Sequence, residues 1–316
     1  MRLSSRLTHC SSAMADASRI AADITVVIPT IGRPLLQDCL RSVAAGLVWP
    51  AELIVVDQSC GDDVAAWVAA LRAEGLAARH LPSAETGIAN ATNRGLEQVR
   101  TPFVAVTHDD CRVDPSWLKA LLARLREGEE AIVTGRVEPA GDGAVPTIVT
   151  SPVPVVHRRP RLDGDDLFPP NMAFPRSVLE QIGYLDEHPS LRTAGEDNDW
   201  AYRALRAGVH IVYDPTPVVS HVGWQPQSAL PSIYRRYARG QGAFYGKHLR
   251  RGDLFIARRA ARDLARCPWL VLRGMLSGNG ELRAMAYGDV TGLVPGLLAG
   301  LRNPGVVRSA VASPER

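Results

Sequence analysis

Asp109-Asp110 is the first of two acidic pairs that could do chemistry in this sequence. The pair ends the apolar run 103–107, and adjacent carboxylates repel each other unless a cation or hydrogen-bond donors compensate them. Oxygen ligands that share a cation with substrate phosphates are typical of Mg²⁺ and Mn²⁺ sites. We therefore predict a divalent metal at this pair. Asp114, which precedes Pro115, is assigned instead to the start of the next helix.

The second pair, Glu196-Asp197, opens the segment 195–208. Acidic residues are expected in a first helical turn because they interact favourably with the helix macrodipole. Three acids within four positions nevertheless exceed what a helix start requires, and an ionised carboxylate there can take a proton from a hydroxyl group. We predict a general base at this pair.

Further candidates are single residues and one basic helix. His221 could complete a metal shell with Asp110, since Mn²⁺ tolerates imidazole, although a lone histidine is more often structural. Asp57 follows the apolar run 53–56, and a carboxylate at a strand end can bind a ribose hydroxyl or a base N–H. The tail contributes arginines on adjacent helical turns that could neutralise a departing diphosphate: Arg235, Arg236 and Arg239.

The elements that must position these residues are indicated by hydrophobic periodicity. From residue 24, apolar runs at 24–28, 53–56 and 103–107 alternate with amphipathic segments such as 34–45 and 62–74. This alternation predicts buried parallel strands with helical crossovers, an arrangement that binds ligands at the carboxyl ends of its strands. Three candidate groups fall at those ends: Pro29-Thr30, Asp57 and Asp109-Asp110. The sequence contains neither of the glycine-rich phosphate-binding motifs GxGxxG and GxxxxGK(S/T). A metal ion and arginines are therefore expected to hold phosphates.

The rest of the chain is less regular. Residues 138–170 are rich in proline, glycine and short polar side chains, which predicts a loop-rich excursion. Helices are expected at 175–182 and 196–207, a strand at 210–213, and mainly helices beyond 231. Residues 1–23 are expected to be a disordered leader without a secretory signal.

Composition excludes several classes of protein. The 316 residues are 46% apolar and 22% charged, as in ordinary globular domains. An aromatic share of 6% argues against reading single-stranded nucleic acid by base stacking. Five scattered cysteines without a CxxC argue against a disulfide scaffold or a cysteine zinc site and favour a reducing, cytoplasmic location. No apolar stretch reaches the roughly 18 residues expected of a membrane-spanning helix.

The charge is distributed unevenly. Residues 231–316 carry fifteen Lys and Arg against five Asp and Glu, whereas the first 230 residues carry 21 basic and 28 acidic groups. An acidic body with a basic tail suggests a phosphate-rich partner such as a nucleotide, a lipid phosphate or an anionic membrane face. A solvated, arginine-rich helix surface explains the charge equally well.

Over about residues 24–225, eight segments in order resemble the family 2 glycosyltransferases of the GT-A fold. They are Val26-Val27-Ile28-Pro29-Thr30; Val55-Val56-Asp57-Gln58-Ser59; 87–95 with Asn93-Arg94-Gly95; Thr107-His108-Asp109-Asp110-Cys111 with 115–118; Pro170-Asn171-Met172-Ala173-Phe174; Gly183-Tyr184-Leu185-Asp186-Glu187; Gly195-Glu196-Asp197-Asn198-Asp199-Trp200; and His221. Two positions depart from the family: His108 stands where many members have an acid, and Pro169-Pro170 stands where a glycine pair is often found. The processive-synthase element Gln-x-x-Arg-Trp is not recognisable.

The resemblance implies a Rossmann-like α/β fold with a mixed, mainly parallel sheet flanked by helices and a C-terminal helical extension. A nucleotide-sugar half would span 24–137 and an acceptor and catalytic-base half 138–225, which together form a GT-A domain at 24–225. A basic, mainly helical extension would follow at 226–316.

The resemblance also assigns roles by position. Asp197 would be the catalytic base, with Glu196 as its supporting neighbour. The metal ligands would be Asp110, Asp109 and His221. The donor nucleotide would be bound by Pro29, Thr30, Asp57, Asn93 and Asp109. The diphosphate and acceptor side would contain Asn171, Trp200, Arg235 and Arg239.

The activity implied is transfer of one sugar, with inversion, from a nucleotide-diphospho-sugar to an acceptor hydroxyl with Mn²⁺ or Mg²⁺. The acceptor could be a sugar, a lipid-linked molecule or a natural product, with no nucleic-acid partner. The location would be cytoplasmic, with peripheral contact to an anionic inner membrane face left open. Two alternatives remain: a sugar-phosphate nucleotidylyltransferase and a catalytically silent nucleotide-sugar-binding protein.

Overall fold

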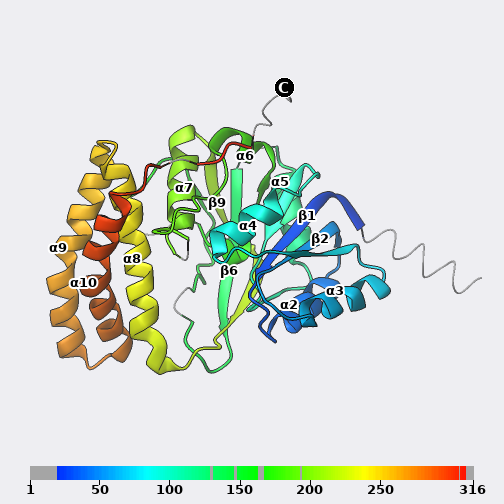
Figure 1. The fold of residues 1–316 in the computed structure, drawn as a ribbon, viewed down its shortest axis with the longest axis horizontal. Coiled ribbons are helices and arrows are strands. Elements are labelled where there is room, and N and C mark those ends of the chain that lie inside the picture. The colour runs from blue at the N-terminus through cyan, green and yellow to red at the C-terminus, as the bar shows by residue number, and fades with distance from the viewer. Residues whose placement is uncertain are drawn as a thin grey trace, which may run out of the picture.

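One mixed sheet organises the protein (Figure 1). The computed structural model describes residues 20–128, 131–145, 148–162, 167–192, 194–305 and 307–310, and within them nine strands form this sheet. Eight strands follow the order β3-β2-β1-β4-β8-β6-β9-β5, and β7 pairs with β9. Of the leader expected at 1–23, residues 1–19 lie outside the described residues. Residues 20–23 belong to the first strand.

The first half of the sheet is parallel, as the strand–helix alternation predicts. Its strands are β1 (Ile20–Thr30), β2 (Trp49–Asp57), β3 (Ala78–Pro82) and β4 (Phe103–Val106). The crossover helices are α2 (Leu36–Ala44), α3 (Asp63–Ala73) and α4 (Ile88–Leu96). Alternate β1 residues pack on opposite faces: Val26 lies in a core with α2, α3 and α5, and Val27 in a core with α4 and α7. This two-sided burial explains the continuous apolar runs.

The second half of the sheet is mixed. Its strands are β5 (Cys111–Val113), β6 (Ala131–Ala140), β7 (Val155–His157), β8 (Met172–Pro175) and β9 (His210–Val222). β8 runs antiparallel to both β4 and β6, whereas β6 and β9 are parallel. The associated helices are α5 (Trp117–Leu125), η1 (Pro169–Asn171), α6 (Ser177–Ile182), α7 (Glu196–Ala207) and η2 (Gln227–Ala229). Within the loop-rich segment expected at 138–170, the described residues contain one short strand, β7, which pairs with β9.

β9 is much longer than the strand expected at 210–213. It continues to Val222 because its second part pairs with both β6 and β5. Its register places His221 opposite Cys111, the first residue after Asp109-Asp110. The long strand therefore carries a distant histidine to the acidic pair.

Three long helices form the C-terminal extension, as the sequence predicts: α8 (Leu230–Leu249), α9 (Leu254–Ser277) and α10 (Gly280–Gly300). They stand together beside the sheet domain (Figure 1). α8 and α10 approach so closely that a Cβ on Gly296 would clash with the backbone of Arg239. Among the described residues, no helix combines the length and hydropathy needed to span a membrane.

Candidate active site

The carboxyl ends of β1 and β4, the end of β9, and the N-terminus of α7 surround a cleft of about 860 Å³. α8 and α9 form its opposite wall. Eight of the candidate residues named from the sequence line this cleft: Pro29, Thr30, Asp109, Asp110, Glu196, Asp197, His221 and Arg236. Carboxylates that are about 90 positions apart in the chain therefore face one cavity.

Asp109 is buried at the end of the β4 segment and held by residues that follow β1. The hydroxyl of Thr30 donates to Asp109 Oδ2 at 2.7 Å, and Arg33 Nη1 lies 2.5 Å from Asp109 Oδ1. Burial raises the pKa of Asp109, and the charge of Arg33 opposes that shift. The β1 end thus orients this carboxylate while keeping it at the edge of the cleft.

Asp110 is partnered by two residues that the sequence reasoning did not assign to the site. Arg33 Nη1 lies 3.2 Å from Asp110 Oδ2, and the indole N–H of Trp224 donates to the same oxygen at 3.1 Å. The Arg33 guanidinium also lies 4.4 Å from the centre of the Trp224 ring. Burial acts to raise the pKa of Asp110, but His221, His108 and Arg33 outweigh it and hold that pKa well below its usual range. Asp110 is therefore an ionised ligand candidate.

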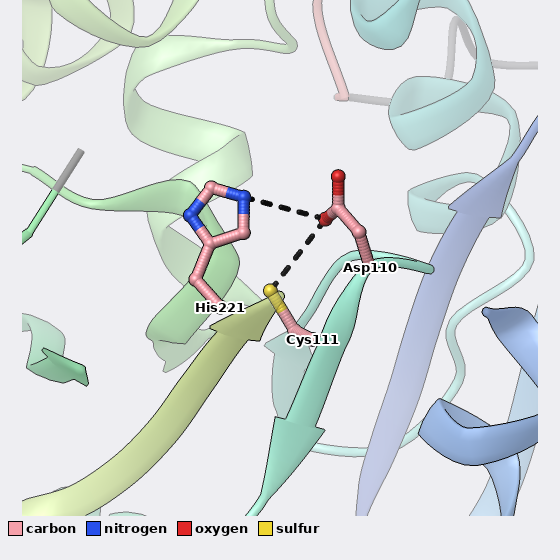
Figure 2. A group of neighbouring side chains, drawn as sticks. All are labelled: Asp110, Cys111 and His221. Carbon is pink, nitrogen blue, oxygen red and sulfur yellow. Dashed lines mark hydrogen bonds and ion pairs between the residues drawn. The ribbon is translucent and has the colours of Figure 1, made fainter. Parts of the chain in front are cut away.

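The residues around Asp110 fit a divalent metal. Figure 2 shows its Oδ1 between the imidazole of His221 and the thiol of Cys111; Nε2 and Sγ each lie 3.7 Å from it. Burial raises the pKa of Cys111 well above its usual value, so the thiol stays protonated. His221 Nδ1 is buried and has no hydrogen-bond partner among the described residues. A carboxylate with an imidazole suits Mn²⁺, whereas a protonated thiol is a poor ligand.

α7 presents the second acidic pair from its first turn. Gly195 adopts a left-handed φ of 85°, and a Cβ there would collide with the Gly240 backbone of α8. This close approach fixes the start of α7 against the opposite wall of the cleft. Asp197 is half-buried, and its Oδ1 accepts the backbone N–H of Asn198 at 2.8 Å. A helix N-terminus favours negative charge at this position.

Glu196 differs sharply from its neighbour. Burial raises its pKa well above the usual value, and the adjacent charge of Asp197 adds to the shift. Its Oε2 is buried without a hydrogen-bond partner among the described residues. Glu196 therefore favours its protonated form, which leaves Asp197 as the better proton acceptor.

The arginines of α8 are not arranged as the sequence predicted. Arg236 lines the cleft, whereas Arg235 lines a separate cavity of about 990 Å³ and Arg239 lines neither. The backbone at Arg235 and Arg239 meets Gly292 and Gly296 of α10. That close helix contact turns their shared face away from the cleft and points the neighbouring face toward it. α9 adds Arg259, Arg262 and Arg266 to the cleft wall.

Two residues predicted to bind the donor are already fully partnered. Asp57 accepts the N–H of Ser59 at 2.8 Å and lies 2.9 Å from His80 Nε2. Asn93 is completely buried: its amide donates to Leu185 O at 2.9 Å and its carbonyl accepts the N–H of Leu185 at 3.0 Å. Neither side chain lines the cleft, although Gln58, next to Asp57, does.

Asn171 and Trp200, predicted on the acceptor side, are also buried away from the cleft. The Asn171 amide donates to Arg136 O and Pro217 O at 2.8 and 2.9 Å, and its oxygen accepts from Trp117 Nε1 at 2.8 Å. Trp200 packs on Phe174 and donates to Gly183 O at 3.0 Å. These two side chains hold loops and core elements in place.

Comparisons with known proteins agree with this fold. The Glycosyltransferase like family 2 profile matches residues 21–243, whereas no curated protein sequence matches the chain. A Pyrobaculum calidifontis mannosyltransferase, PcManGT, solved with GDP-Man and Mn²⁺, is 17% identical with a TM-score of 0.59 and covers 94% of each chain. S. aureus TarS 1–349, solved with UDP-GlcNAc, is 13% identical with a TM-score of 0.55 and covers 85% of this chain and 90% of its own. With its GT-A type α/β sheet and a profile match over most of its length, the chain belongs to the family 2-like glycosyltransferases.

Proposed function

We propose that the protein is a metal-dependent glycosyltransferase that inverts the anomeric configuration of one transferred hexosyl group. The observation that carries this proposal is that Asp110 and Asp197 line the same cleft. Direct displacement needs a stabilised leaving group on one side of the anomeric carbon and a base on the acceptor hydroxyl on the other. The two acidic pairs supply groups for these separate tasks.

On the donor side, Asp110 and His221 would hold Mn²⁺ or Mg²⁺, with Asp109 beside them. Bound there, the metal would neutralise charge on the diphosphate. Arg33 lies against both carboxylates, where a guanidinium can also pair with phosphate oxygens. Pro29, Thr30 and Gln58 would line the nucleobase pocket. Because both oxygens of Asp57 have partners, its proposed part in base recognition is indirect, through the strand end that carries Gln58.

The donor is proposed to be a nucleotide-diphospho-sugar. Support comes from the two solved relatives, one bound to GDP-Man and the other to UDP-GlcNAc. At their 13% and 17% identity, neither fixes the base or the sugar for this chain. We expect the reaction to take place in the cytoplasm.

On the acceptor side, Asp197 would take the proton from the attacking hydroxyl. Glu196, which favours its protonated form, would hold a neutral carboxyl next to it. Arg236 and Gln241 of α8 line the wall that the acceptor would approach. The acceptor would be a sugar, a lipid-linked molecule or a natural product bearing a free hydroxyl.

A donor screen followed by product analysis tests the proposal. UDP-, GDP-, dTDP- and CDP-sugars are each added with and without Mn²⁺, and the melting temperature is measured, since a ligand that binds only the native state stabilises it. We expect one nucleotide to raise the melting temperature mainly in the presence of Mn²⁺. Proton NMR of the product should then show the anomeric configuration opposite to that of the donor. Retention, or no response to any nucleotide-sugar, would contradict the proposal.

A further inference from the structure

The helix α9 carries apolar side chains on its solvent-exposed face as well as on its buried face. One face packs against α8 and α10 through buried residues such as Ile256, Cys267 and Leu270. The opposite face exposes large apolar side chains at helical spacing in its second half. Their exposed fractions are 52% for Trp269, 56% for Leu272, 72% for Met275 and 78% for Leu276. We call these four residues the α9 apolar face.

The neighbouring helix α10 also exposes a row of apolar side chains. α10 follows α9 after a short turn and packs against it. Its own exposed residues recur every three or four positions: Tyr287, Val290, Val294 and Leu298. Exposed apolar residues are normal when scattered singly, but stripes on two adjoining helices indicate an interaction surface.

The charge beside the α9 apolar face indicates the partner. α9 contains five arginines and one aspartate. Arg258 and Arg273 are exposed, and the Arg273 guanidinium lies 5.1 Å from the centre of the Trp269 ring. An amphipathic helix with tryptophan and leucine on one side and arginine along its border is typical of the interface of an anionic bilayer.

A second copy of the chain would fit this surface less well. Two α9 helices facing each other would bring their arginine rows together, with a single aspartate in each helix to offset them. Asp263 is further occupied by the hydroxyl of Tyr245, which lies 2.5 Å from its Oδ2. An anionic lipid surface instead complements the arginines and accepts the apolar side chains.

We propose that the α9 apolar face, together with the exposed Arg258 and Arg273 of the same helix, docks the protein on an anionic lipid bilayer. Arg262 and Arg266 of the same helix line the active-site cleft. Docking through α9 therefore brings the cleft alongside the lipid headgroups. This docking is independent of the proposed glycosyl transfer and can be tested without turnover.

Vesicle flotation of the full chain tests the proposal. Vesicles of phosphatidylcholine alone are compared with vesicles containing 30% phosphatidylglycerol, at low and high salt. We expect binding to the anionic vesicles that weakens as salt increases. The double variant Leu272→Ser/Leu276→Ser should bind roughly tenfold more weakly, because it removes apolar groups that enter the interface. Arg258→Glu/Arg273→Glu should lose most of the difference between anionic and neutral vesicles.

Leu47→Ser is the matched control, because Leu47 is equally exposed (56%) but lies between α2 and β2. It should float as the unmodified protein does, and all variants should keep its melting temperature and its response to nucleotide-sugars. Absence of flotation, or unchanged flotation of the leucine variant, would overturn the proposal. Light scattering gives a further check: a dimer that the leucine variant dissociates would assign the α9 apolar face to a second copy and refute lipid docking.

Discussion

Asp110 and Asp199 are both buried carboxylates beside cationic side chains, yet they belong to different kinds of site. Asp199, on α7, lies 2.7 Å from Lys247 Nζ, 2.8 Å from Arg203 Nε and 2.8 Å from His248 Nε2. Lys247 also lies 2.8 Å from Asp186. This cluster is enclosed by α7, α8 and the loop after α6, and we call it the closed charge cluster.

The cationic contacts of Asp110 are longer by comparison. Its nearest cation, Arg33, is 3.2 Å away, and His221 Nε2 is at 3.7 Å. Cationic neighbours hold the pKa of both carboxylates well below the usual range despite burial. The pKa direction therefore does not separate function from structure here. What separates them is whether the carboxylate still has room, on a cleft, for a further ligand.

The sharpest test of the difference uses α7, where Asp197 faces the cleft and Asp199 faces the closed charge cluster. Asp197→Asn removes the proposed base but keeps the shape of the side chain. We expect turnover to fall roughly 10²–10⁴-fold, while the melting temperature and the donor-induced shift stay unchanged. Turnover is measured by nucleotide release under saturating donor. Activity within a few-fold of that of the unmodified enzyme would show that Asp197 is not the base.

Asp199→Asn should instead lower the stability of the folded protein. It leaves Lys247, Arg203 and His248 without their shared carboxylate, and breaking a buried ion pair costs about 3–5 kcal/mol. Urea unfolding should show this loss at neutral pH, with Asp62→Asn, an exposed residue without a side-chain cap bond, as the neutral control.

The loss should also depend on pH in a defined direction. Because the folded-state pKa of Asp199 is depressed, its stabilisation is present above the unfolded-state pKa and is lost as pH falls through the folded-state value. The two proteins should therefore converge in acid. A pH-independent difference would indicate lost packing in place of lost charge.

At the metal side, Asp110→Asn should weaken Mn²⁺ binding at least about tenfold, since it removes the ionised ligand. Binding is read from the electron paramagnetic resonance signal of free Mn²⁺, without any turnover. Cys111→Ser is the matched control, because a thiol kept protonated by burial contributes little to such a site. An equal loss in both variants would show that the thiol is a ligand and that the site is softer than a manganese site.

Sequence reasoning found the parts of the cleft that end apolar strands or begin helices. Asp109-Asp110 follows β4 and Glu196-Asp197 opens α7, and such positions are visible in a one-dimensional pattern. Arg33 was missed because nothing in its spacing shows that the turn after β1 folds back over the β4 end. Trp224 was missed because β9 was expected to stop nine residues before its end, and a short strand would not have carried the chain to the acidic pair.

Two other motif residues have their polar groups paired in the interior of the protein. Asn93 and Asn171 lie inside segments that carry the family resemblance, but their amide groups donate to backbone oxygens inside the protein. The acceptors are Leu185 O for Asn93, and Arg136 O of β6 and Pro217 O of β9 for Asn171. A side chain with every polar atom paired in the interior has no capacity left for a substrate. Such pairing depends on three-dimensional contacts. Residue type and order alone therefore could not distinguish these internally paired side chains from binding residues.

Glu196 supplies the smallest predicted effect and the finest test of the comparison, because it is buried like Asp199 but lies on the cleft like Asp197. Its raised pKa means that the folded protein keeps a proton that the unfolded chain releases above about 4.5. The unmodified protein should therefore lose stability relative to Glu196→Gln as pH rises above that value, and the two should match below it. We expect Glu196→Gln to be more stable than the unmodified protein at pH 8, with turnover reduced only a few-fold. A variant that is less stable at neutral pH and matches the unmodified protein in acid would mean that Glu196 is ionised and paired in the folded protein, like Asp199 in the closed charge cluster.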